Sequence, residues 1–152
     1  MTNRARNTHR QVLSAAAAAM ALGLSLLLCT GARADAPAPL EVRAKLVEIP
    51  SSFPPDDLYD YAYVMRYEVI GGPMDKTQIL VAHYKPRVPR NKIKDGAKLH
   101  VGGTLRSFAQ GDVHKLVLSP DLKKMWKGAL VDEFAATDRK SVRYWCLQAD
   151  PG

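Results

Sequence analysis

The sequence predicts a mainly β protein: a small, closed antiparallel barrel of five or six strands, with one helix near the C-terminus. Three observations predict it. Apolar and polar residues alternate in several short runs, which is the period of a half-buried strand. Glycine and proline clusters separate these runs, and a single run after them has helical spacing. A closed barrel is favoured because closure leaves no unpaired strand edges.

The first two predicted strands carry the clearest alternation. Residues 40–46 alternate between apolar and charged side chains, and Val47 and Ile49 then carry apolar side chains in the opposite phase. A phase change of one residue inside a strand indicates a β-bulge. After the proline-rich loop 50–57, residues 59–69 alternate again, with tyrosine at most of the core-facing positions. We expect these tyrosines to be buried, with Tyr59 and Tyr61 the nearest to the surface.

The middle of the chain predicts a hairpin followed by a long loop. Gly71, Gly72 and Pro73 form a turn that joins the second strand to a third at residues 79–84. Residues 85–98 contain two prolines and an Asp-Gly turn, and we expect no regular structure there.

The last third predicts two short strands, a helix and a final strand. Alternation resumes over residues 99–105, where Gly102 and Gly103 indicate a sharp bend or the close approach of another backbone. Residues 113–118 form the next strand. In the helix that follows, Ser119 is the cap, Pro120 the first residue, and the apolar positions are Leu122, Met125, Trp126, Ala129 and Leu130. Residues 142–147 are expected as a last strand at an edge of the sheet.

The first 34 residues are typical of a secretory signal peptide. Three arginines precede the apolar run 12–28, and Ala32-Arg33-Ala34 is a small-x-small cleavage site. We therefore expect a signal peptide at residues 1–34 and a single β-barrel domain at residues 35–152, periplasmic or secreted from a bacterium and without a transmembrane anchor after cleavage. The alternatives are an uncleaved anchor and a lipid on Cys29.

The net charge bears on which partners the protein can bind, and the cysteine content bears on whether it can form a disulfide. The chain has 22 basic and 15 acidic residues, but the leader holds four of the basic residues and no acidic one, which leaves 18 against 15. This small excess, together with export, does not favour nucleic acid as a partner. Cys146 is the one cysteine after the leader, so we expect a buried thiol and no intramolecular disulfide.

The strand pattern resembles the OB-like barrels of secreted modules, including netrin-like domains. The stretches that carry the resemblance are residues 41–49, 63–72 and 79–82. This resemblance implies the fold only, because the disulfides of netrin-like domains are absent and the usual OB helix position is occupied by the loop 85–98. The chain also shows a fainter resemblance to modules that accompany bacterial polysaccharide-acetylation enzymes. The stretches that carry it are residues 67–69, residues 79–83 and Tyr144-Trp145.

The loop after the third strand is the main candidate binding site. Between His83 and His100 there are six basic residues and one acidic residue, whereas residues 41–75 hold seven acidic and three basic ones. Such a cationic loop suits anionic groups such as uronates or phosphates. A solvated loop with no ligand is the alternative. The candidate ligand-binding residues are Tyr84, Lys85, Arg87, Arg90 and Lys92.

Three histidines offer a weaker, catalytic alternative. His83, His100 and His114 lie on or beside three different predicted strands and could bind zinc if their side chains met, although structural histidines are the simpler interpretation. No nucleophile motif or cofactor motif is found, and we expect no cofactor. The sequence therefore predicts an exported, non-catalytic binding or accessory module for an anionic glycan or its processing machinery. The alternatives are a small metal-dependent hydrolase and a protein-binding assembly or inhibitor-like subunit; the oligomeric state stays open.

Overall fold

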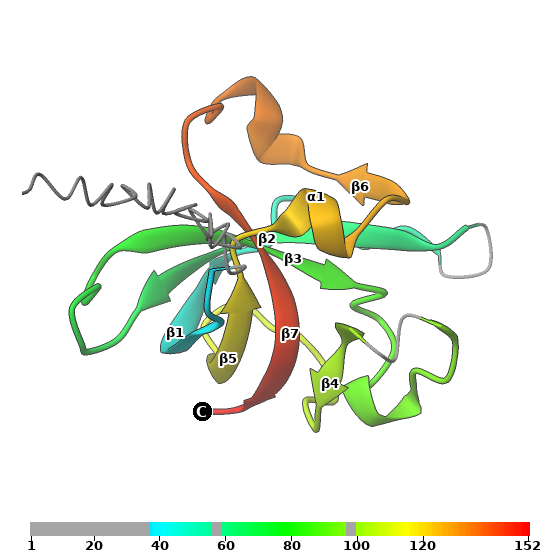
Figure 1. Ribbon diagram of the computed structural model, residues 1–152, viewed down its shortest axis with the longest axis horizontal. Coiled ribbons are helices and arrows are strands. Elements are labelled where there is room, and N and C mark those ends of the chain that lie inside the picture. Colours follow the sequence, from blue (N-terminus) through cyan, green and yellow to red (C-terminus); the bar gives the residue numbers. More distant parts are fainter. Residues whose placement is uncertain (1–36, 56–58, 97–99) are drawn as a thin grey trace, which may run out of the picture. The chain divides into compact units, whose positions relative to one another are not determined.

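The computed structural model describes residues 37–55, 59–96 and 100–152 (Figure 1). The expected signal peptide, Cys29, the loop residues Asp56 and Asp57, and Lys98 and Leu99 lie outside the described residues. Seven strands belong to one mixed sheet: β1 (Leu40–Glu48), β2 (Tyr61–Val69), β3 (Gln78–Tyr84), β4 (Gly102–Gly103), β5 (Val113–Ser119), β6 (Ala129–Val131) and β7 (Arg143–Pro151). The described residues also contain a one-turn helix, α1 (Leu122–Met125), and the 3₁₀ turns η1 (Arg90–Lys92) and η3 (Glu133–Ala136).

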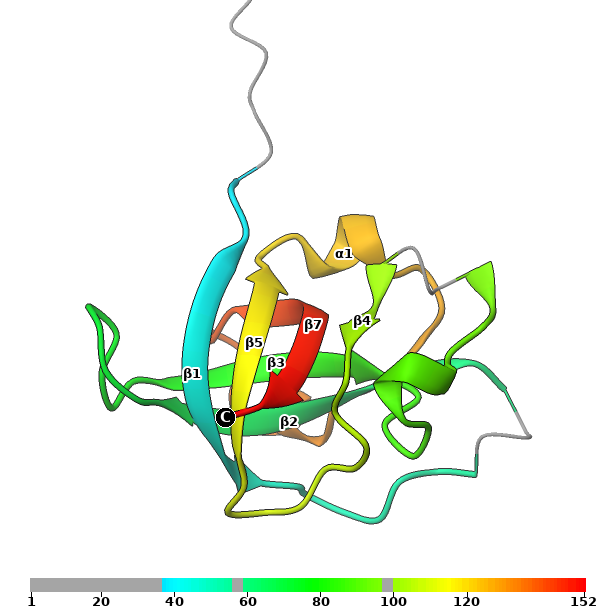
Figure 2. The same ribbon diagram turned by 90° about the horizontal axis from the view of Figure 1, so that it is seen from below.

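Five of the strands pair in a closed circuit. β1 is antiparallel to both β2 and β5, β2 is antiparallel to β3, and β5 is antiparallel to β7. The circuit is completed by β3 and β7, which run parallel and pair Leu80 with Arg143 and Ala82 with Trp145. Figure 2 shows β1, β5 and β7 side by side, with β2 and β3 passing behind them.

The expectation of a purely antiparallel sheet is wrong, for a topological reason. Strand directions cannot alternate all the way around a circuit with an odd number of strands, so at least one neighbouring pair must be parallel. Here that pair is β3 and β7. The short strands β6 and β4 add two more parallel pairings, to β2 and β7 respectively.

The C-terminal third differs most from the sequence-based expectation. The expected helix ends after one turn, because Trp126 is extended (φ −132°, ψ 127°), and residues 129–131 instead pair with β2 as β6. Ser119 is not its cap: its hydroxyl accepts a hydrogen bond from the backbone N–H of Asp121, the residue at the N-cap position. Strand β7 is also not at an edge, since it lies between β5 and β3. Tertiary pairing has overridden helix propensity here.

Several local predictions are confirmed. The register of β1 against β2 shifts between Leu46 and Glu48, which is the expected bulge. The hairpin of β2 and β3 forms across Gly71 and Gly72, both with positive φ. Gly103 has φ +104°, and a Cβ atom there would overlap the backbone of Ala149, as the expected close approach requires.

Strands β2 and β3 are buried on both faces. The inner cluster draws residues from β1, β2, β3, β5 and β7 and includes Tyr63, Met65, Tyr67, Leu46 and Leu116. The outer cluster covers the opposite face of β2 and β3 and includes Ala62, Val64, Leu80, Phe134 and Trp145, with Leu122 and Trp126 packed against it. The segment between β5 and β7 therefore lies on this outer face, where Figure 1 shows α1 and β6.

The burial of the tyrosines at positions 59–67 agrees with the expectation at all but one position. Tyr63 and Tyr67 are fully buried, and Tyr59 is 46% exposed, as expected. Tyr61, which we placed near the surface, is fully buried, and its hydroxyl donates to the carbonyl of Pro54. No helix among the described residues is long and apolar enough to span a bilayer.

The burial pattern predicts where truncation destabilises the fold. Replacing Leu46, Val69 or Leu116 with Ala, one at a time, should lower the free energy of unfolding by roughly 2–4 kcal/mol, because each removes a buried aliphatic side chain and leaves a cavity. Urea unfolding followed by circular dichroism measures this. Ile70→Ala, at an exposed position, is the control. Parent-like stability in all three core variants would contradict the assigned inner face.

Candidate functional site

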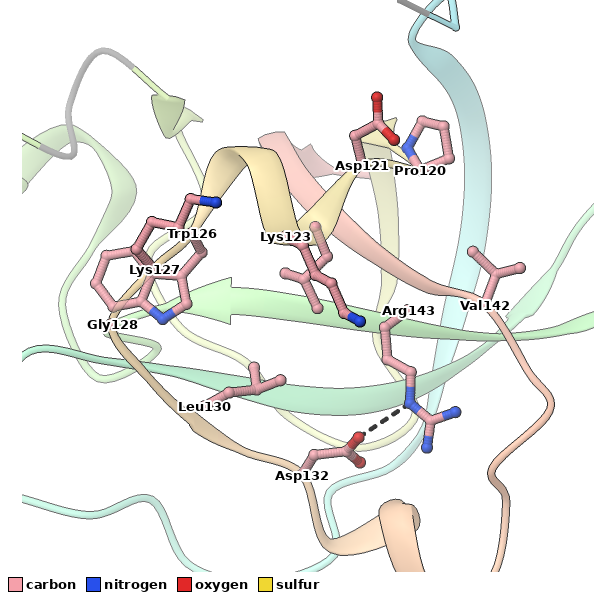
Figure 3. A pocket seen from close by; sticks show the side chains of 11 residues that line it. Pro120, Asp121, Lys123, Trp126, Lys127, Gly128, Leu130, Asp132, Val142 and Arg143 are labelled. Atoms are coloured by element: carbon pink, nitrogen blue, oxygen red, sulfur yellow. Dashed lines mark hydrogen bonds and ion pairs between the residues drawn. The ribbon is translucent and has the colours of Figure 1, made fainter.

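A hollow of about 760 Å³ opens between α1, β6 and the start of β7 (Figure 3). Its apolar lining is formed by Pro120, Leu122, Trp126, Leu130 and Val142. Leu130 is 40% exposed and Val142 is 52% exposed, and they are two of the four exposed large apolar side chains in the described part of the chain. The hollow thus presents apolar surface that no described part of the chain covers.

The two carboxylates that line the hollow are held in ion pairs. Asp132 accepts a 2.9 Å contact from Nε of Arg143, whose other nitrogens donate to the carbonyls of Ser141 and Asp138. Asp121 pairs with Lys124 at 2.9 Å. In both contacts a positive charge lies next to the carboxylate and balances its negative charge.

Two lysines at the hollow remain uncompensated. Lys123 and Lys127 line it, both are exposed, and in the described part of the chain no carboxylate lies within ion-pair distance of either. In Figure 3 the side chain of Lys123 reaches over the hollow from α1, opposite Leu130. The arrangement therefore combines an apolar floor with two free positive charges.

Trp126 forms one wall and is held rigidly. Its ring stacks on that of Trp145, with centroids 5.7 Å apart and planes 15° apart, and its Nε1 donates to the carbonyl of Ala129 at 2.8 Å. Gly128 lies against the ring so closely that a Cβ atom would overlap it. These contacts hold the chain extended beyond α1, and this shape is what opens the hollow.

A smaller pocket of about 300 Å³ lies on the other side of Trp126. Here Tyr84 donates to Oδ2 of Asp95 at 2.8 Å, and Nζ of Lys85 contacts Oδ1 of Asp60 at 2.5 Å and Asp95 at 3.5 Å. The bond with Asp60 raises the pKa of Lys85, and the same bond lowers the pKa of Asp60. Burial and the bond to Asp95 raise the pKa of Tyr84. The charge of Lys85 is therefore already compensated.

The expectation that Arg90 is an exposed ligand-binding cation is wrong. Arg90 is 3% exposed, and its guanidinium donates to the carbonyls of Tyr84, Lys85 and Val88 at 2.6–2.8 Å. The loop folds around this side chain because its carbonyls have no strand partners and need donors. Of the five candidate residues, Arg87 and Lys92 are exposed, and their role in binding stays a prediction.

The structure does not bring the three histidines together. His83 on β3 and His114 on β5 are buried beside Phe108, whereas His100 is exposed and its carbonyl accepts from Nε1 of Trp145. Among the described residues, no group of three His, Cys, Asp or Glu side chains could hold a metal ion. The metal-dependent hydrolase therefore gains no support from the geometry.

The histidine environment is nevertheless unusual. His114 shares a 3.2 Å hydrogen bond with the hydroxyl of Tyr67, but neither ring nitrogen of His83 has a hydrogen-bond partner among the described residues. Burial, with the nearby charge of Arg90, holds the pKa of His83 well below its usual value, and burial also lowers the pKa of His114. Cys146 is buried as expected, and burial raises its thiol pKa to about 12, so it is an inert core residue.

Sequence reasoning missed Lys123, Lys127, Leu130 and Val142. The helical spacing of the apolar residues after Pro120 assigned residues 122–130 to one continuous helix, and Val142 was expected at the start of the last strand. Gly128 was the signal against that interpretation, because glycine inside a helix is destabilising and here follows a tryptophan and a lysine.

Comparison with known proteins adds no identity. The chain matches no protein-family model, no curated protein and no solved structure. The candidate site therefore rests on its own geometry.

The role assigned to Arg90 is testable. Arg90→Ala should lower the free energy of unfolding by about 2–4 kcal/mol, because it leaves buried carbonyls without charged donors. Arg90→Lys should recover part of this loss, since one ammonium cannot match the guanidinium fork. Arg87→Ala, in the same loop but exposed, should stay within about 0.5 kcal/mol of the parent. Equal effects at positions 87 and 90 would contradict this role.

The buried histidines predict an acid-sensitive fold. A histidine whose pKa is lowered by folding contributes full stability above its unfolded pKa, near 6.5, and loses it as pH falls from there toward the folded value. The free energy of unfolding should thus decline between pH 7 and pH 5, by up to about 1.4 kcal/mol per pH unit for each imidazole. His83→Phe, of similar shape, should flatten the decline, and His100→Gln should not. An unchanged slope in His83→Phe would rule out this cause.

Proposed function

We propose that the protein is an exported, non-catalytic binding module that holds an anionic ligand in the hollow beside Trp126. The underlying fold in this proposal is a five-stranded barrel of the OB type. The closed circuit of pairings and the inner cluster that it encloses support the barrel. OB barrels bind ligands with the face of their second and third strands and with the adjacent loops, and the hollow lies in the segment between β5 and β7, on the outer face of β2 and β3.

The proposal rests on one observation. Lys123 and Lys127, which have no acidic partner among the described residues, line an apolar hollow large enough for a small molecule. Pockets that bind small molecules commonly have volumes of about 300–1,000 Å³ and an apolar lining with a few oriented polar groups. Clustered cations raise the local concentration of anions. An anion with an apolar or planar portion would satisfy both features of the hollow.

A binding role fits the hollow better than catalysis does. Asp121 and Asp132 are both held in ion pairs with basic side chains, so neither carboxylate is aimed at a group in the hollow on which it could act. The proposed export, which follows from the leader sequence, points to a ligand outside the cytoplasm.

The basic loop supports a second candidate function, the binding of an anionic polysaccharide along the surface. Arg87, Lys92 and Lys94 are exposed, and no carboxylate among the described residues pairs with them. Against it, Lys85 is neutralised by Asp60 and Asp95, which also place negative charge beside any polyanion that reached from this loop toward Trp126.

Two charge-matched double variants separate these sites. Lys123→Glu/Lys127→Glu reverses the sign of two charges at the hollow, and Arg87→Glu/Lys92→Glu makes the same change of charge on the loop. The probes are an oligogalacturonate and decanoate, each at low and physiological salt, with binding followed by calorimetry and by tryptophan fluorescence. Trp126 and Trp145 are the two tryptophans of the chain; Trp126 lines the hollow, but both line the smaller pocket, so the fluorescence signal reports binding near Trp126 and the two variants assign it to a site.

We expect the hollow variant to bind at least tenfold more weakly and the loop variant to bind within twofold of the parent. Binding of the parent should weaken with salt, because ions screen exposed charges over about 8 Å at physiological ionic strength. Weaker binding by the loop variant, with parent-like binding by the hollow variant, would assign the binding site to the loop. No binding of either anion by a folded parent would contradict the proposal.

A further inference from the structure

We infer that the hollow takes the alkyl chain of a single-chain anionic amphiphile, while Lys123 and Lys127 hold the charged headgroup. The shared chemistry is one acyl chain with a carboxylate or phosphate head, as in a fatty acid or a lysophospholipid. This inference rests on the proposed binding function of the hollow and specifies its ligand class.

Apart from Lys123 and Lys127, the charged side chains that line the hollow are already engaged, which argues against a sugar. Asp132 and Arg143 bond to each other, and Arg143 also bonds to two carbonyls; Nε1 of Trp126 is used by Ala129. A sugar that entered the hollow would therefore leave hydroxyl groups without partners, at a cost of about one hydrogen bond each. An alkyl chain has no such groups and loses nothing by leaving water.

The floor is aliphatic and partly exposed. Leu122, Leu130 and Val142 supply branched aliphatic surface, and two of the three are among the most exposed large apolar residues of the described chain. An alkyl chain laid between them would remove this surface from water. The volume of about 760 Å³ falls in the middle of the range for small-molecule pockets.

The positions of the lysines suit a headgroup at the mouth. Lys123 extends from α1, and in Figure 3 its ammonium group points toward the hollow, whereas that of Lys127 points away past Trp126, so Lys123 contacts the headgroup directly and Lys127 reaches it by a change of side-chain rotamer. Both side chains are exposed, which lets a carboxylate or phosphate bind them without complete loss of hydration. The charge of the rim excludes cationic amphiphiles in favour of anionic ones.

Chain length is the decisive variable. Hexanoate, octanoate and decanoate, each below its micelle concentration, carry the same headgroup and differ by two methylenes. Affinity should rise about fourfold per methylene if the chain enters an apolar hollow, or roughly 15-fold for each step of the series. Calorimetry and tryptophan fluorescence measure it. Decanoyl lysophosphatidate, compared with decanoate, distinguishes a lysophospholipid from a fatty acid as the source.

Variants of the floor test the same contact. Leu130→Ser/Val142→Ser should reduce the gain per methylene to less than twofold while leaving the affinity for hexanoate within about threefold of the parent. Both positions are exposed, so the fold should persist, and matched melting curves verify this. Ile70→Ser, on the exposed end of β2, is the control and should keep the full chain-length dependence.

The outcomes separate this inference from the proposed function. If an oligogalacturonate or an acidic peptide binds in a lysine-dependent way and the carboxylates show no chain-length dependence, the amphiphile is wrong and the anion-binding hollow stands. Equal affinity for decyltrimethylammonium and decanoate would overturn the headgroup assignment. If Lys123→Glu/Lys127→Glu leaves the affinity for all anionic probes unchanged, the proposed function itself fails.

Discussion

The parallel pairing of β7 with β3 is the constraint on which the rest of the structure depends. A circuit of five strands needs one parallel neighbour, and this pairing supplies it through Leu80–Ala82 and Arg143–Trp145. β4 then pairs with the later part of β7, at Gln148 and Ala149. Ser119 at the end of β5 is paired with Trp145 near the start of β7, so the chain between them makes an excursion and returns to nearly the same place. The short strand β6 attaches this segment to β2, and the shape of the rest of the segment is not set by strand pairing.

The outer face of β2 and β3 determines how the segment between β5 and β7 packs. Ala62, Val64 and Leu80 make the face apolar, and the segment packs Trp126 and Phe134 against it. The coverage is incomplete, because the chain is extended at Trp126 and bends at Gly128 instead of continuing the helix, and Asp132 is paired with Arg143 on another side of the hollow. The hollow is the space that remains, and it lies on an excursion supported by a rigid sheet, where binding sites commonly occur.

Periodicity and turn chemistry predicted most of the strands but not their arrangement. The alternating tyrosines of β2 and the bulge after Leu46 follow from local sequence patterns, and glycine at position 103 marked a close approach without naming its distant partner, Ala149. The end of the helix at Trp126 and the burial of Arg90 depend instead on partners far along the chain, a neighbouring strand in one case and loop carbonyls in the other. The hollow could not be predicted for the same reason, since its lysines and its exposed leucine and valine come together only when the helix is cut short.

The central claim is that an acyl chain lies between Leu130 and Val142 with its charged end at Lys123 and Lys127. The most direct measurement is a set of intermolecular nuclear Overhauser effects between decanoate and the protein labelled at its leucine, valine and lysine side chains. The account predicts contacts from the terminal methyl and the middle of the chain to the methyl groups of Leu122, Leu130 and Val142, and from the carbon next to the carboxylate to the lysine side chains. Contacts confined to the basic loop around Arg87, or to methyl groups of the inner cluster, would contradict it.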